Sequence, residues 1–223
     1  MTRKLFFQAI GKFAAGLLIF GALLFIPAGT LRYPAGWLLI GILFAPMFIA
    51  GIVLMFKNPG LLEKRLDAKE DEAEQKAVLA LSALMFVSAF VSAGLCFRFD
   101  RFLLPWWASV AGAAVFLLAY VMYAEVLREN TYLSRTVGVA EDQKVIDTGL
   151  YGVVRHPMYT ATLILFPSMG VVLGSPISFF ILLLYIPIIV KRIKNEEKVL
   201  TEGLEGYAEY KTRVRYKLIP FVW

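Results

Sequence analysis

Five uncharged runs restrict the folds open to this 223-residue chain. They cover residues 13–31, 33–56, 77–97, 102–124 and 156–190. A helix needs about 20 apolar residues to cross the hydrocarbon core of a bilayer, so each run has the length of at least one crossing. Because 59% of the residues are hydrophobic and only 18% are charged, we predict an all-α, polytopic integral membrane protein.

The last run, residues 156–190, is too long for a single crossing and contains Gly174-Ser175-Pro176. Glycine close to proline is a strong turn signal, so we expect two short helices that form a C-terminal hairpin. Pro187 removes one backbone hydrogen bond and should bend the second helix about one turn before the charged residues. The sequence therefore predicts six transmembrane helices, or five if the hairpin does not fully cross.

The basic residues are divided unequally between the two sides of these predicted spans. Twenty of the 23 lie before residue 13, in the loops 57–76 and 128–155, or after residue 190, and the other three are Arg32, Arg98 and Arg101. Basic residues accumulate in cytoplasmic loops, so we predict that both termini are cytoplasmic. The same distribution accounts for the net charge of +6, because the excess basic residues lie at one face of the membrane. We therefore expect membrane lipids as partners and no nucleic acid.

The two halves of the chain differ in chemistry. We interpret residues 1–127 as N-terminal transmembrane helices with few polar groups. Residues 128–223 carry unusual polar chemistry in two segments, 128–159 and 191–220, which only the hairpin separates. A hairpin returns its ends to the same side, so the two segments should lie together and form a polar pocket at the cytoplasmic face.

The first segment ends in the run Arg155-His156-Pro157-Met158-Tyr159, which contains the only histidine of the chain. Pro157 suits the first position of a helix and biases His156 away from helical backbone angles. The unpaired N–H groups of that helix start could bind an electron-rich ligand group. Alternatively, Arg155 marks the membrane boundary, His156 caps the helix, and Tyr159 belongs to an interfacial aromatic belt.

The second segment begins with charged residues on the helix after Pro187. Arg192 and Glu196 are four residues apart and share one helical face, either turned toward the pocket or forming a solubilising surface pair. Tyrosines alternate with cations over residues 207–216, a pattern that an interfacial helix on anionic headgroups would also explain.

Taken together, the two segments resemble the isoprenylcysteine carboxyl methyltransferase family and the wider group of membrane-embedded phospholipid methyltransferases. The resemblance covers about residues 128–220. The residues that carry it are Gly149-Leu150-Tyr151, Arg155-His156-Pro157-Met158-Tyr159, Arg192, Glu196-Glu197, Tyr207, Tyr210 and Pro220.

The resemblance implies a methyltransferase that uses S-adenosyl-L-methionine, with its cofactor pocket in the C-terminal half and a lipophilic substrate arriving from the bilayer. It implies catalytic roles for Arg192, which would hold the anionic group of the substrate, and for Glu196, which would also contact the cofactor. It implies no metal ion. The other cofactor contacts that it implies are Thr136, Gln143, Lys144, Val145, Ile146, Tyr151, His156, Pro157, Met158 and Tyr159.

The chemistry of the methyl acceptor leaves alternatives open. A carboxylate is ionised at neutral pH and needs no general base, and the guanidinium of Arg192 could bind it bidentately. An amine, as in phospholipid headgroup N-methylation, would have to lose a proton to His156 or Glu196. Further alternatives are an NAD(P)H-dependent membrane reductase of lipids and a non-catalytic lipid-binding scaffold. The spans hold no charged residues of the kind that line an ion pathway, which argues against a channel or transporter.

Overall fold

The computed structural model describes residues 3–66, 73–133 and 137–223, and every regular element within these ranges is a helix. The all-α prediction is therefore confirmed. The elements are α1 (Arg3–Ala28), α2 (Pro34–Lys57), α3 (Pro59–Leu66), α4 (Ala73–Arg98), α5 (Trp106–Glu129), the short 3₁₀ helix η1 (Gly149–Gly152), α6 (Pro157–Val172), α7 (Pro176–Leu182), α8 (Tyr185–Gly203) and α9 (Tyr207–Arg213).

Five segments of the described chain are long and apolar enough to cross a membrane. They are Leu5–Ala28, Pro34–Lys57, Lys76–Arg98, Trp106–Glu129 and Pro176–Gly203, while Pro157–Val172 is apolar but shorter. This agrees with the expectation of five or six transmembrane helices, in which the two counts differ only in how the C-terminal hairpin is treated. The chain is a multi-pass integral membrane protein.

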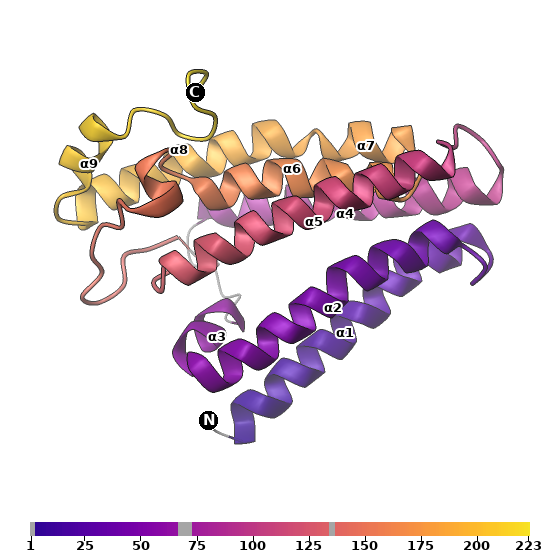
Figure 1. Ribbon diagram of the computed structural model, residues 1–223, viewed down its shortest axis with the longest axis horizontal. Coiled ribbons are helices and arrows are strands. Elements are labelled where there is room, and N and C mark those ends of the chain that lie inside the picture. The colour runs from indigo at the N-terminus through magenta and orange to yellow at the C-terminus, as the bar shows by residue number, and fades with distance from the viewer. Residues whose placement is uncertain (1–2, 67–72, 134–136) are drawn as a thin grey trace.

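The long helices run side by side, so that the connections gather at the two ends of the bundle (Figure 1). The turns α1–α2, α4–α5 and α6–α7 lie at one end, whereas the N-terminus, α3, the segment before α6 and α9 lie at the other (Figure 1). The charge-rich segments are therefore together, as predicted. That this end faces the cytoplasm remains a prediction from the charge distribution.

The predicted hairpin turn lies between α6 and α7. Gly174 adopts φ +69°, a left-handed conformation that glycine takes without strain, and the side chain of Ser175 accepts a hydrogen bond from the backbone N–H of Ser178. The two helices approach closely, because a Cβ atom on Gly170 would lie 2.4 Å from the backbone nitrogen of Phe179.

Pro187 interrupts the second arm of the hairpin. Proline has no N–H to donate to the carbonyl of Leu183, four residues earlier. The α-helical pattern is broken there, with α7 ending at Leu182 and α8 beginning at Tyr185. Two shorter-range bonds of 3.0 Å, from Leu184 N to Ile181 O and from Ile186 N to Leu183 O, replace the regular ones. The interruption thus lies one helical turn further from the charged residues than the sequence suggested.

A compact apolar core joins the helices of the bundle, and it contains fully buried side chains such as Leu39, Phe116, Leu173 and Ile189. Large apolar side chains also point outward from the spans, including Leu18, Phe56 and Leu118, each at least 71% exposed. An outward apolar surface is what helices in contact with lipid require.

Candidate active site

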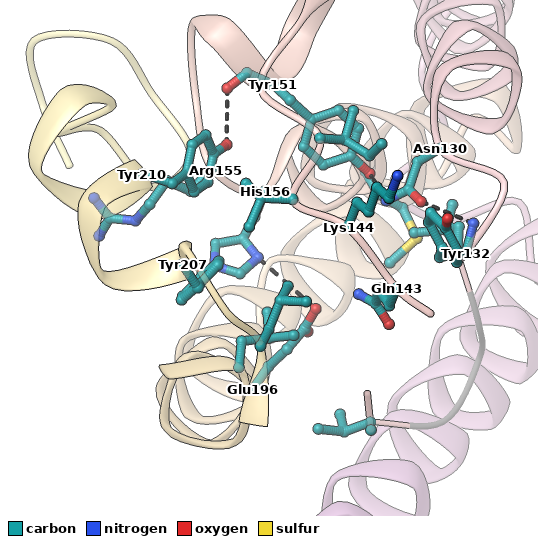
Figure 2. Close-up of a pocket in the computed structure, with 18 of the residues that line it drawn as sticks. Asn130, Tyr132, Gln143, Lys144, Tyr151, Arg155, His156, Glu196, Tyr207 and Tyr210 are labelled. Carbon is teal, nitrogen blue, oxygen red and sulfur yellow. Dashed lines mark hydrogen bonds and ion pairs between the residues drawn. The ribbon is translucent and has the colours of Figure 1, made fainter. Parts of the chain in front are cut away.

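The loop that precedes α6 positions Tyr151 in the lining of the site. Gly149 starts η1 with φ +54°, and this turn buries the ring of Tyr151. The Tyr151 hydroxyl accepts a hydrogen bond of 2.9 Å from Asn130 Nδ2, and its carbonyl accepts one of 2.8 Å from the Tyr210 hydroxyl (Figure 2). Burial raises the pKa of Tyr151 to about 12, although the bond from Asn130 opposes this shift, so the phenol is neutral at physiological pH.

His156 lies immediately before α6, where Pro157 occupies the first helical position as predicted. His156 is the N-cap residue of α6, as the capping interpretation expected, although its side chain makes no capping hydrogen bond. Instead, Nε2 lies 3.3 Å from Glu197 Oε1, and Nδ1 lies 4.0 Å from Glu196 Oε1. An ionised carboxylate can only accept a hydrogen bond, so Nε2 carries a proton and Glu197 fixes the orientation of the ring.

Arg155 is buried and connects the first segment to the C-terminal segment. Its Nε lies 2.7 Å from Glu197 Oε1, and its Nη1 donates to the carbonyls of Val214 and Arg215 at 2.8 and 2.9 Å. Glu197 also pairs with Lys217 at 2.8 Å. The Arg155 side chain is 7% exposed, so it is a structural anchor between these segments.

Backbone hydrogen bonds strengthen this connection. Arg155 N donates to Tyr216 O and His156 N donates to Lys217 O, both at 2.9 Å. The C-terminal segment therefore lies directly along the start of α6, and the expectation that the two polar segments are neighbours is fulfilled.

Tyr159 lies between the two residues of α8 that the sequence singled out. Arg192 Nε donates to the Tyr159 hydroxyl at 2.9 Å, and that hydroxyl donates to Glu196 Oε2. Arg192 and Glu196 are thus joined through Tyr159, which is 4% exposed. These contacts turn both residues toward the interior, so the interpretation as a solubilising surface pair is wrong.

These side chains surround one cavity with about 820 Å³ of empty space, its open mouth included. Gln143, Lys144 and His156 reach it from the loop and from the start of α6, and Glu196 faces them from α8 (Figure 2). Pro157 is buried in α6 and does not line the cavity, and Thr136 lies outside the described residues. The predicted site residues that line it are Gln143, Lys144, Val145, Ile146, Tyr151, His156, Met158, Tyr159, Arg192 and Glu196.

Other residues that line the cavity were assigned no site role from the sequence. Leu200 on α8 and Leu204 directly after it continue the four-residue spacing of Arg192 and Glu196, a periodicity that could have identified them. The Tyr207 hydroxyl is buried and has no hydrogen-bond partner among the described residues, which leaves it available to a ligand. These additional lining residues are Asn130, Tyr132, Leu133, Val137, Gly138, Arg155, Leu200, Leu204, Tyr207 and Tyr210.

Comparisons with known proteins relate this region to membrane enzymes. Residues 107–205 match the phospholipid methyltransferase family, a stretch from α5 to the end of α8 that holds nearly all of the cavity lining. A segment of 91 residues is 29% identical to the Delta(14)-sterol reductase of Mus musculus. That match covers 40% of this chain and 22% of the reductase, so the chain corresponds to only about a fifth of that relative.

The fold as a whole is similar to a solved structure of the eukaryotic intramembrane Ras methyltransferase, isoprenylcysteine carboxyl methyltransferase. The TM-score is 0.60, with 19% sequence identity, over 96% of this chain and 77% of that chain. The likeness in fold extends beyond the family match, into the N-terminal helices. Residues 107–205 are thus similar to the phospholipid methyltransferase family, and the fold of the chain is similar to that of isoprenylcysteine carboxyl methyltransferase.

Proposed function

We propose that this protein is an S-adenosyl-L-methionine-dependent methyltransferase that esterifies the carboxylate of a lipid-bearing, isoprenylcysteine-like substrate. The observation that carries the proposal is the chain of contacts from Arg192 through Tyr159 to Glu196, inside the cavity of the matched family region. These contacts place the guanidinium of Arg192, which would bind an anionic methyl acceptor, beside the carboxylate of Glu196, which would face a cationic methyl donor. Both residues lie at the polar end of a bilayer span.

The cavity chemistry fits S-adenosyl-L-methionine. Glu196 would be the counter-charge for the cationic part of the donor, and the rings of Tyr151 and Tyr207 would supply aromatic faces that favour cations and flat heterocycles. The unpaired Tyr207 hydroxyl supplies a further polar group. Gln143, Lys144, Val145 and Ile146 would contribute the opposite wall.

The protein's part in the reaction is chiefly positioning. S-adenosyl-L-methionine, when bound, supplies an electrophilic methyl group. Arg192 would pair with the acceptor carboxylate, which is ionised at neutral pH and needs no base. The hydrogen bond from Arg192 Nε to Tyr159 restricts the guanidinium to one orientation. Burial of Tyr159 and His156 keeps water from this end of the cavity.

His156 is oriented by protein groups and is proposed as a cofactor contact. Its Nε2 proton is directed at Glu197, and its ring stacks on Tyr159 with 5.7 Å between centroids. An amine acceptor would need a group to take its proton, for which Nδ1 of His156 and Glu196 are the candidates. The phospholipid methyltransferase match makes headgroup N-methylation the second methyl transfer reaction to test.

A lipid reductase is a second candidate function, because the matched relative is a sterol reductase. The same cavity would then hold a nicotinamide cofactor. Cofactor binding separates the two classes: a methyltransferase binds S-adenosylhomocysteine, and a reductase binds NADP.

The test uses the purified protein in lipid nanodiscs with tritiated S-adenosylmethionine. The acceptors are N-acetyl-S-farnesylcysteine and phosphatidylethanolamine, and calorimetry measures the binding of S-adenosylhomocysteine and of NADP. The proposal expects tritium in a base-labile ester of the prenylcysteine. Arg192→Gln should remove at least 90% of this activity, whereas Lys191→Gln, an exposed neighbour on α8, should retain it.

Three outcomes count against the proposal. Base-stable label in phosphatidylethanolamine would assign the N-methyl reaction instead. Binding of NADP together with no binding of S-adenosylhomocysteine would favour a reductase. Folded protein that binds neither cofactor would support a scaffold without catalysis.

A further inference from the structure

A second hollow lies on the other side of α8 from the cavity. Arg192, Glu196 and Leu200 line the cavity, whereas Lys194, Glu197 and Lys198 line a shallow groove with about 600 Å³ of empty space. The two sets alternate along the helix, as expected for its two faces. We call this hollow the lysine groove, and its lining is Lys194, Glu197, Lys198, Thr201, Glu202, Lys211 and Lys217.

The positive charge of the lysine groove is only partly compensated. Of its two carboxylates, Glu197 is already shared by Arg155, His156 and Lys217. Lys194 and Lys198 are both exposed, and neither has an ion-pair or hydrogen-bond partner among residues 3–66, 73–133 and 137–223. Spaced four residues apart on one helix, they repel each other. The groove is therefore suited to an anion.

The end of the groove at Lys194 lies at the depth of lipid headgroups. Val190 is the last residue of the charge-free run, and Lys194 and Lys198 follow it by about 6 and 12 Å along the helix. The polar layer of a bilayer is about 5 to 8 Å thick on each side of the hydrocarbon core. Lys194 therefore reaches phosphate depth when the apolar run fills the core.

An apolar turn follows Lys217, the last residue of the groove lining in the sequence. The chain after Lys217 folds into a tight turn in which the backbone N–H groups of Lys217, Leu218 and Ile219 all donate to Trp223 O. The turn presents Phe221 at 88% exposure and Val222 at 74% exposure. Exposed apolar side chains within five residues of a groove lysine match an amphipathic ligand better than a soluble anion.

We infer that the lysine groove binds the phosphate of an anionic phospholipid, whose acyl chains lie against the apolar turn. The phosphate would be held by Lys194, Lys198 and Lys211, while Lys217 remains paired with Glu197. This site is separate from the proposed catalytic cavity and does not depend on the activity assigned to that cavity.

Native mass spectrometry in a neutral detergent tests this site directly. The purified protein is titrated with dioctanoyl phosphatidylglycerol, with dioctanoyl phosphatidylcholine, and with phosphatidylglycerol in the presence of excess glycerol 3-phosphate. The double variant Lys194→Gln/Lys198→Gln is compared with Lys191→Gln/Arg215→Gln, which removes the same charge from exposed positions outside the groove. Thermal unfolding of each variant verifies folding.

The inference expects saturable binding of phosphatidylglycerol, weaker binding of phosphatidylcholine, and little competition from glycerol 3-phosphate. Loss of two lysines at a membrane surface should weaken the binding roughly thirtyfold in the groove variant, and the control variant should change by less than threefold. Equal losses in both variants would show diffuse surface attraction and overturn the inference. Effective competition by glycerol 3-phosphate would assign the groove to a soluble phosphate, and no binding of phosphatidylglycerol would refute the site.

Discussion

Arg192 Nε lies 2.9 Å from the hydroxyl of Tyr159, so the position of the guanidinium depends on a residue 33 places earlier in the chain. Tyr159→Phe removes this bond together with the one to Glu196 and leaves the ring in place. We expect kcat for methyl transfer to fall roughly tenfold to a hundredfold, because small misplacements of reacting groups are costly. Steady-state kinetics with a prenylcysteine acceptor measure the effect.

Tyr185→Phe is the matched control for that prediction. Tyr185 is also a buried tyrosine between α6 and α8, and its hydroxyl lies 3.0 Å from Thr162 Oγ1, but it does not line the cavity. Its loss should change kcat by less than threefold. If both phenylalanine variants lose activity equally, Tyr159 acts only through packing.

Glu197 stabilises the fold by compensating buried cations. Removing one partner of a buried ion pair leaves an uncompensated charge, so Glu197→Gln should lower the stability by about 3 kcal/mol. Thermal unfolding in detergent measures this. Glu125→Gln is the control, because Glu125 pairs with Arg128 at the surface, where ion pairs contribute little. A Glu197 variant as stable as the Glu125 variant would contradict the anchoring role.

Alkaline pH should destabilise the polar end of the bundle. Burial raises the pKa of Tyr151 to about 12 and also raises those of Tyr207 and Tyr210. The unfolded chain then loses its phenolic protons before the folded one does, so stability is complete below pH 10 and declines as the pH rises from 10 to 12. Unfolding midpoints between pH 8 and 12 measure the slope, which should be smaller in Tyr151→Phe. An unchanged slope in that variant would exclude Tyr151 as a source.

Close packing in the hairpin makes Gly170 intolerant of a larger residue. Gly170→Ala places a methyl group against the backbone of Phe179 and should cost about 2 to 3 kcal/mol through overpacking. Gly41→Ala provides the comparison, since a methyl group on Gly41 would meet nothing within 4 Å. A lower midpoint of thermal unfolding is expected for the first variant only. Equal midpoints would mean that α6 and α7 can separate without loss.

The sequence was most informative where single residues determine backbone geometry. Pro157 begins a helix, Gly174 forms a turn, and Pro187 interrupts a helix, because their conformational limits are local properties. Even so, the interruption lies a turn earlier than expected. The hydrogen bond that Pro187 cannot donate would have ended at the carbonyl of Leu183, so the helical pattern breaks near Leu183 and not at the proline.

Side-chain partners were less predictable than helices. The sequence assigned a role to Glu196 but none to Glu197, although adjacent helical residues point about 100° apart. Only the packing of the C-terminal segment shows that Glu196 faces the cavity while Glu197 meets Arg155 and Lys217. Tyr207 and Tyr210 line the cavity for the same reason, since their positions depend on contacts with residues about 60 places away, such as Tyr151.

The backbone carbonyls of residues 214–217 accept the hydrogen bonds that hold Arg155 and His156 in place. These acceptors lie about 60 residues after the groups that they hold. All the spans can therefore enter the membrane while the cavity is still incomplete. A protein without residues 214–217 would keep all five spans but lose the backbone carbonyls that hold Arg155 and His156, so assembly of the site depends on a segment that follows the last span.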